Sequence, residues 1–131
     1  MSDELVSWLE QQLDVDERIV QAIEDEEQHW DPGDKNLGSA VIGAEYGAAV
    51  VVGPYDHLDW SVRQYIAEHD PARVLREIDA KRRILAEHAL NGWVCDTCDN
   101  GEVDQTFPCP TLRLLALPYA DRPGYREEWR P

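Results

Sequence analysis

The sequence lacks most of the features that reveal a function directly. Its 131 residues contain no apolar run of the roughly 18 residues that a transmembrane helix needs. The first residues, MSDELVSWLEQQ, are acidic and lack the basic start and apolar stretch of a signal peptide. We therefore expect no membrane association and a cytoplasmic location, in a chain with room for one domain and one modest core.

Enzyme signatures are also missing. The chain contains no H-E-x-x-H, G-x-S-x-G or G-x-G-x-x-G motif. The glycine-rich stretch 37–53 is not followed by the Lys and Ser/Thr of a phosphate-binding loop, which argues against nucleotide binding. Because acidic residues are abundant, no catalytic carboxylate pair can be singled out. We predict no catalytic residue, and enzymatic activity stays an open alternative.

Basic residues are scarce. Twelve Lys and Arg face 27 Asp and Glu, which gives a net charge of −15. Residues 1–34 hold 12 acids and one base, for a charge of −11, and residues 35–131 account for the remaining −4. Such a surface repels nucleic acids and anionic membranes and attracts a basic protein. We expect no nucleic acid binding and a basic protein partner; an acidic mimic of DNA that occupies a DNA-binding protein is a special case.

Only three cysteines are present, and they lie close to a histidine in the last third of the chain. The pattern is His88-x6-Cys95-x2-Cys98-x10-Cys109, and Asn100-Gly101 follows the pair. An Asn-Gly turn after C-x-x-C is typical of a zinc knuckle, because two thiolates grip one metal only if the backbone turns tightly. Three thiolates and one imidazole would complete a closed, structural zinc shell.

Other interpretations of the cysteines stay open. A redox pair requires a helix starting at the C-x-x-C, which Asp99-Asn100-Gly101 disfavours. A disulfide would leave one thiol over, and three unrelated thiols are a further alternative. His88 is the predicted fourth ligand because it is nearest in the chain, with His57 and His69 as alternatives.

The chain predicts helices at both ends around a short β unit. Leu5, Leu9 and Leu13 form an apolar stripe over 3–13. A capping box at Asp14 indicates a second helix to about residue 28, and one continuous helix over 3–28 is the alternative. Small and β-branched residues over 37–53 predict a hairpin that turns near Gly43 to Gly47.

Two helices are expected over 59–92. The first covers 59–69, with Asp59 as N-cap and an apolar set of Trp60, Val62, Tyr65 and Ile66. The second begins with Asp70 as N-cap and Pro71 at the first helical position, runs to about residue 90, and is stopped by Gly92.

This second helix carries much of the chain's positive charge. Its basic residues are Arg73, Arg76, Lys81, Arg82 and Arg83. They could contact nucleic acid, but the net charge favours pairing with the acidic N-terminal helices. The expected apolar face is formed by Val74, Leu75, Ile78, Leu85 and His88.

Residues 93–131 combine the cysteine knuckle, a short helix and an aromatic tail. The short helix starts at Pro110 and is ended by Pro118. We expect the tail to fold back on the body, although Tyr119, Tyr125 and Trp129 could instead anchor an interface. The predicted fold class is α+β, a small, mainly α-helical single domain over 1–131 with a short β-hairpin and a zinc-knuckle-like loop.

Several segments resemble a known family. HDPARVLREIDAKRRIL (69–85) and CPTLRLLALPYADRPGYREEWRP (109–131) closely resemble uncharacterised actinobacterial and actinophage proteins that share a domain of unknown function. DELVSWLEQQLDVDERIV and the WDPG of Trp30–Gly33 are similar to the same family, so the resemblance covers most of the chain. It implies a bacterial or phage-infected host cell and no particular activity.

Two classes of function follow. The first is a zinc-stabilised protein that acts by protein–protein interaction through an acidic or aromatic surface. The second is a small metal-dependent or nucleotide-processing enzyme, which would require an open metal position or a cleft with convergent carboxylates.

Overall fold

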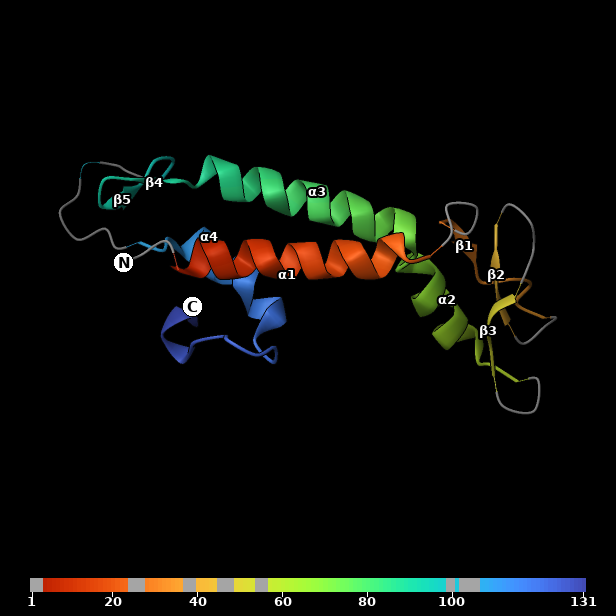
Figure 1. Cartoon of the computed structure of the whole chain (residues 1–131). Coiled ribbons are helices and arrows are strands. Elements are labelled where there is room, and N and C mark those ends of the chain that lie inside the picture. The colour runs from red at the N-terminus through yellow and green to blue at the C-terminus, as the bar shows by residue number, and fades with distance from the viewer. Residues whose placement is uncertain are drawn as a thin grey trace. The chain divides into compact units, whose positions relative to one another are not determined.

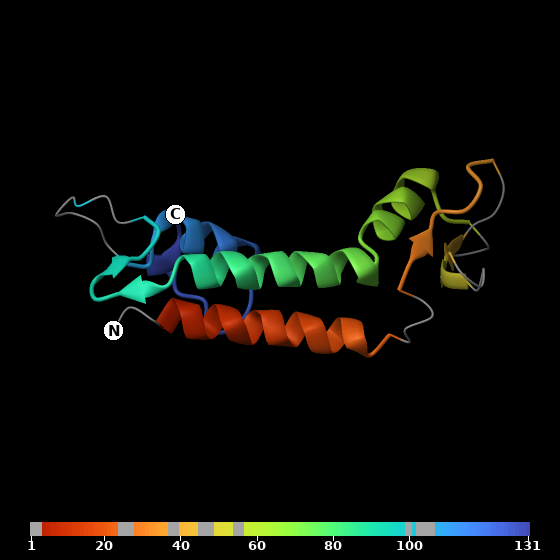
Figure 2. The ribbon, with the colours of Figure 1, turned by 90° about the horizontal axis from the view of Figure 1, so that it is seen from above.

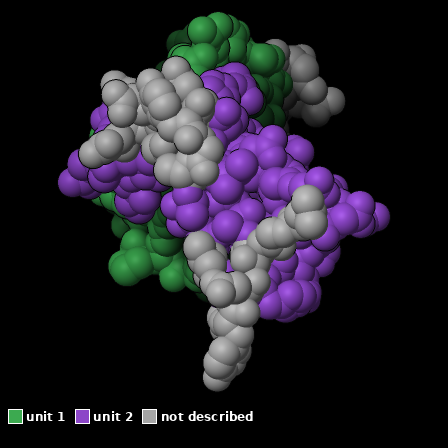
Figure 3. All heavy atoms as spheres, turned by 90° about the vertical axis from the view of Figure 1, so that its right-hand side faces the viewer, with its two compact units in different colours: residues 1–16, 78–131 green, residues 17–77 purple. Residues whose placement is uncertain are grey.

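The computed structural model describes residues 4–23, 28–36, 40–44, 49–53, 57–98, 101 and 107–131. Contacts divide the chain into two compact units, unit 1 (residues 1–16 and 78–131) and unit 2 (residues 17–77), which Figure 3 distinguishes by colour. None of the described helices is both long and apolar enough to cross a membrane. The prediction of a single domain over 1–131 stays a prediction.

The N-terminal helix α1 spans Glu4–Gln21 without interruption. The expectation of a new helix capped at Asp14 was therefore wrong, and the continuous alternative is confirmed as far as Gln21. Leu5, Leu9 and Leu13 are each at most 1% exposed, because their four-residue spacing places them on one face. Residues 24–27, within the predicted extension to residue 28, lie outside the described part.

Helix α3 spans Pro71–Glu87, and its start is the one predicted. The Asp70 carboxylate accepts a hydrogen bond from the Arg73 N–H at 2.9 Å, as an N-cap should. The helix ends three residues earlier than predicted, because the chain turns at His88 to enter the strand that follows. Ile78 and Leu85 of the predicted apolar face are buried, whereas Val74 and Leu75 are half-buried.

Within unit 1, Figures 1 and 2 show the first half of α1 beside the second half of α3, running in opposite directions. Asp14 of α1 and Arg82 of α3 form an ion pair at 2.9 Å. An exposed pair of this kind contributes only about 0–1 kcal/mol, and Leu13 of α1 and Ile78 and Leu85 of α3 are buried. The expected pairing of acidic and basic helices is confirmed at this contact.

A small hairpin follows α3. Strands β4 (Leu90–Asn91) and β5 (Val94–Cys95) are antiparallel, and Leu90 is opposite Cys95. Gly92 forms the turn with a φ of +66°, which glycine adopts at little cost. Gly92 was predicted to stop the long helix; it instead turns the hairpin.

Helix α4 spans Pro110–Ala116 and is followed by two 3-10 turns, η3 (Leu117–Tyr119) and η4 (Glu127–Trp129). The tail folds back on α1, as expected. The rings of Trp8 and Trp129 lie 5.5 Å apart, and Tyr125 contacts both. Tyr119 and Trp129 are only 4% and 5% exposed, so both side chains pack in the core.

Unit 2 contains a three-stranded antiparallel sheet in the order β1 (Trp30–Asp31), β2 (Ala40–Gly43), β3 (Ala49–Val52). The hairpin predicted for 37–53 is confirmed in β2 and β3. Its first residues, 37–39, and residues 45–48 at its predicted turn lie outside the described residues. Strand β1 was not predicted, since two residues give no periodic signal. Val41 of β2 is fully buried.

Helix α2 spans Trp60–Glu68, close to the predicted range. Asp59 occupies the N-cap position, but its side chain makes no capping hydrogen bond and instead pairs with His57 at 2.8 Å. Val62 and Tyr65 are 41% and 67% exposed, although both were expected on the apolar face. The residues buried on this helix are Ala67 and, unexpectedly, Arg63.

The fold class is α+β, as predicted: four α-helices accompany a short antiparallel sheet and a small hairpin in the part of the chain that the structure describes.

Candidate metal centre

The four predicted ligands come from three elements of unit 1. His88 is the first residue after α3, Cys95 lies in β5, Cys98 follows in a turn, and Cys109 is the N-cap of α4. One side-chain ligand atom from each residue lies within 4.8 Å of the other three. The site therefore joins the end of one helix to the start of another through the hairpin between them.

The imidazole lies at the centre of contacts with all three thiols. The Nδ1 atom of His88 is 3.3 Å from the Sγ of Cys95, 3.4 Å from that of Cys98 and 3.5 Å from that of Cys109. A tetrahedral zinc ion with Zn–S of about 2.3 Å and Zn–N of about 2.0–2.1 Å requires N–S separations of about 3.6 Å. The donor set and its spacing thus fit one small tetrahedral ion.

Backbone and side-chain hydrogen bonds hold the cysteine turn against α3. The Asp96 N–H donates to the Ala89 carbonyl at 2.8 Å, and the Asn91 side chain donates to the Asp96 carboxylate at 3.1 Å. The Thr97 hydroxyl donates to the carbonyl of Glu87, in the last turn of the helix. Sequence reasoning missed these residues, although Asn and Thr beside a C-x-x-C are the types that commonly fix such turns.

The second turn of the knuckle is described only at Gly101, where φ is +81°. A left-handed residue at this point agrees with the predicted Asn-Gly turn. Asn100 lies outside the described residues. Cys95 and Cys109 are each 2% exposed, whereas Cys98 and His88 are half-buried.

The three thiols differ in acidity. Burial, followed by the neighbouring thiols of Cys95 and Cys109, raises the pKa of Cys98 to about 11. Burial also raises the pKa of Cys109, against the opposing effect of the Leu112 N–H. At Cys95 burial acts in the same direction, but the backbone N–H groups of Cys98 and Thr97 outweigh it and lower the pKa. A bound divalent cation would favour all three thiolates together.

The alternative histidines have other partners in unit 2. His57 pairs with Asp59, and the Nδ1 of His69 lies 2.7 Å from the Tyr65 carbonyl oxygen. The cysteines are free thiols, so no disulfide joins any two of them. Among the described residues, the group that could hold a metal ion is the predicted one, and metal binding by it stays a prediction.

Comparisons with known proteins identify a family and no closer relative. No curated protein and no solved structure matches the chain. A family model described as a family of unknown function, DUF6221, matches residues 2–131. This match confirms the expected domain of unknown function and covers both units. The chain therefore belongs to the DUF6221 family of unknown function.

Proposed function

We propose that this protein is a zinc-stabilised scaffold that acts by binding a basic protein partner. The observation that carries the first half of the proposal is the contact of one imidazole nitrogen with three thiol sulfurs at 3.3–3.5 Å. Zinc suits a tetrahedral set of soft thiolates and one imidazole. Bound there, it would supply a cross-link between α3, the β4–β5 hairpin and α4.

A structural role follows from the number of ligands. Four protein ligands fill a tetrahedral shell, whereas a catalytic zinc keeps one position for water or substrate. His88, Cys95, Cys98 and Cys109 would all serve as ligands, so this site offers no Lewis acid to a substrate. A small metal-dependent enzyme would need an additional, open site.

The second half of the proposal rests on charge. The chain carries −15, and residues 1–16 of unit 1 contain five acidic residues and no Lys or Arg. Binding a polyanion releases counterions only where cations contact phosphate, so the usual source of nucleic acid affinity is weak here. A basic protein is attracted by the same field, and its association should slow as salt rises.

Metal analysis tests the zinc site directly. Protein purified without chelator should contain about one zinc per chain, as expected for a single tetrahedral shell. Cys95→Ser and Cys98→Ser should each abolish stoichiometric zinc, whereas Thr111→Ser, which removes only a methyl group two residues after Cys109, should not. Stoichiometric zinc in both cysteine variants would contradict the assignment.

Binding assays at low and moderate salt test the partner class. We expect the protein to co-elute with a basic protein at low salt, and we expect no gel shift of duplex DNA or RNA. Tight DNA binding at moderate salt that requires Arg82 and Arg83 would overturn the proposal and assign the function to the basic face of α3.

A further inference from the structure

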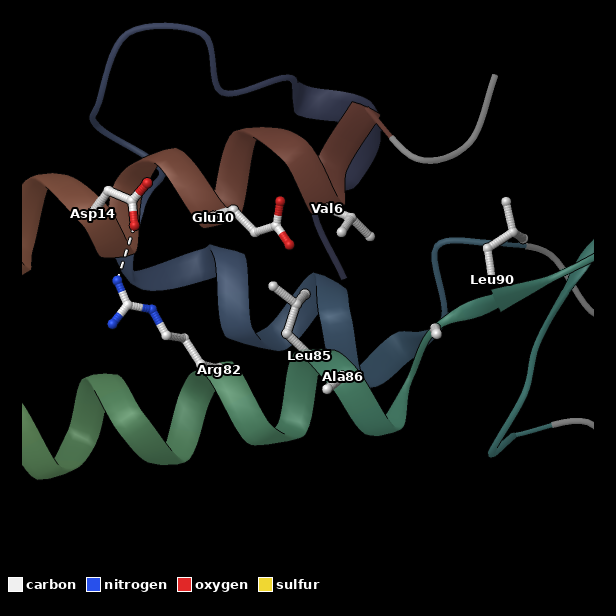
Figure 4. A pocket seen from close by; sticks show the side chains of 8 residues that line it. Val6, Glu10, Asp14, Arg82, Leu85, Ala86 and Leu90 are labelled. Carbon is white, nitrogen blue, oxygen red and sulfur yellow. Dashed lines mark hydrogen bonds and ion pairs between the residues drawn. The ribbon is translucent and has the colours of Figure 1, made fainter.

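A groove on unit 1 offers a specific place for a partner. Its volume is about 530 Å³, and it runs between the first half of α1 and the end of α3 (Figure 4). Five of its eight lining residues are apolar. The Asp14–Arg82 ion pair lies at one end in Figure 4, and Leu90 of β4 lies at the other.

The walls of the groove have the geometry of two helix ridges. Val6, Glu10 and Asp14 follow one another at four-residue spacing along α1, and Arg82 and Ala86 do so near the end of α3; Ala89 extends this wall just beyond the helix. Rows with this spacing are the ridges between which another helix packs. Ala86 and Ala89 are exposed and small, so a helix backbone could approach that wall closely. The buried Leu85 contributes to the floor.

Charge selects the occupant. Glu10 is exposed, and among the described residues it forms no ion pair. Asp14 is already paired with Arg82. A Lys or Arg on the occupant would therefore meet the Glu10 carboxylate, with apolar side chains on either side of it. A second copy of the chain is disfavoured, because each copy carries −15.

We propose that this groove binds an amphipathic, basic helix of a partner protein. The inference rests on the proposed function and names the surface through which it acts. Val6 to Asp14 covers eight residue steps, or about 12 Å of helix axis, so about two turns of the partner would be in contact. In helix-in-groove binding of this kind, apolar side chains of the partner helix at i, i+3, i+4 and i+7 enter the groove.

The metal centre would control one end of the groove. Leu90 and Ala89 directly follow the ligand His88, and Leu90 is opposite the ligand Cys95 in the β4–β5 hairpin. Zinc that fixes the hairpin would therefore also fix these two lining residues. Partner binding should be weaker after zinc is removed.

A synthetic peptide tests the groove. The probe is an amphipathic peptide of about 18 residues with Leu on one face and Lys on the other, since shorter isolated helices are marginal. Its affinity for the zinc-loaded full chain is measured by fluorescence anisotropy at low and moderate salt. Two control peptides carry Glu in place of Lys, or the same residues in a scrambled, non-amphipathic order.

Matched variants locate the site. Ala86→Arg should weaken binding at least tenfold by filling the groove with a cation, and Glu10→Gln should weaken it about threefold by removing one ion pair. Ala80→Arg places the same cation on an exposed position of α3 that does not line the groove, and Asp121→Asn removes a remote exposed carboxylate. Neither control should change the affinity.

The outcomes separate the two proposals. Binding of the amphipathic peptide that falls in the Ala86 and Glu10 variants, with backbone NMR shifts in Val6–Asp14 and Arg82–Leu90, supports the groove. Salt-dependent binding whose affinity is unchanged in both variants, or equal binding of the scrambled peptide, would overturn the assignment of the groove but would still support a basic partner. No binding of either basic peptide at low salt, or binding of the Glu peptide, overturns both. A dimer that Ala86→Arg dissociates would assign the groove to a second copy and overturn this proposal.

Discussion

The two units differ in what stabilises the interior of each. Prolines and glycines aside, 13 of the 16 buried apolar side chains in the described part of the chain belong to unit 1, and three belong to unit 2. Unit 1 combines this core with the Cys3His cluster. Unit 2 instead buries an arginine, Arg63, which is 3% exposed. The comparison shows that the unit with few buried apolar residues relies on a buried polar side chain that pairs backbone carbonyls, whereas the unit with the larger apolar core also gathers four candidate metal ligands.

The role of Arg63 follows from its hydrogen bonds within unit 2. Its guanidinium donates to the carbonyls of Pro32 and Asp34 at 3.0 Å each and to that of Leu58 at 3.1 Å. It also lies over the Trp60 ring, 5.1 Å from the centroid. The fixed fork of donors thus joins the loop after β1 to the start of α2 and leaves these carbonyls paired.

Removing a zinc ligand should have the largest effect, confined at first to unit 1. Cys109→Ser should lose zinc binding, whose apparent free energy in small zinc domains is on the order of 10 kcal/mol at neutral pH. Because whole domains are stable by only about 5–15 kcal/mol, we expect β5 and α4 to lose protection from hydrogen exchange. Unit 2 should keep its protection in β2 and β3.

The control for this variant is Thr111→Ser, which keeps all four ligands. Unchanged zinc content and unchanged exchange of α4 in Cys109→Ser would show that metal binding at this site does not stabilise unit 1, and that apolar packing does.

Replacing the buried arginine should have the next largest effect, confined to unit 2. Arg63→Met leaves three carbonyl groups without this donor, at about 1–3 kcal/mol for each buried one, so we expect a loss of about 3–5 kcal/mol. Arg63→Lys should recover little, because an ammonium group lacks the planar fork. Chemical denaturation and hydrogen exchange of Trp30–Asn36 measure the change.

Arg76→Met provides the matched control, since Arg76 is an exposed arginine of unit 2. An equal, small effect of both substitutions would show that the polar contacts of Arg63 contribute little to stability.

Substitutions at two glycines of unit 1 test how tightly its aromatic side chains pack. Gly124 has a φ of +90°, and a Cβ there would lie 2.7 Å from Nε1 of Trp8. Gly92 has a φ of +66°, and no atom lies within 4 Å of the same position. Gly92→Ala should cost about 1–2 kcal/mol for the left-handed backbone alone. Gly124→Ala should cost about 1–3 kcal/mol more through overpacking, as thermal unfolding would show. Equal effects would mean that Trp8 yields freely.

Local signals in the sequence predicted much of this structure. The Asp70-Pro71 start of α3 was predicted because an N-cap carboxylate and a proline need only neighbouring residues to act. The stripe of α1 was predicted from its four-residue spacing, and the β2–β3 hairpin from small and β-branched residues between glycines. The spacing of the cysteines also identified the four residues that the structure brings together, although no finding tests their binding of a metal.

Non-local interactions explain what was missed. The end of α3 depends on the pairing of Leu90 with Cys95 and on the turn at His88, which the helical pattern of 71–90 does not contain. Arg63 lies four residues before the buried Ala67 on α2, but its polar side chain gave no sign that this position is buried. Two of its three carbonyl partners, those of Pro32 and Asp34, are more than 25 residues away in the chain.

The smallest expected effect is on the pH dependence of folding stability, which should differ between the zinc-free and the zinc-bound protein. In the zinc-free protein the pKa of Cys98 is raised from 9.0 to about 11, so the folded state holds this proton more tightly than the unfolded state. The corresponding stability is present in full below pH 9 and is lost as the pH rises from 9 to 11. The raised pKa of Cys109 acts in the same direction. The lowered pKa of Cys95 acts only below pH 9, where it increases stability as the pH rises.

In the zinc-bound protein the folded state holds thiolates, so stability should instead fall as acid protonates them. Denaturation between pH 5 and 11 should therefore show stability that falls as the pH rises above 9 in the chelated protein, and stability that rises with pH up to about 9 in the zinc-loaded protein. Chelated Cys98→Ser should lose part of the alkaline slope, and an unchanged slope would show that other groups cause it.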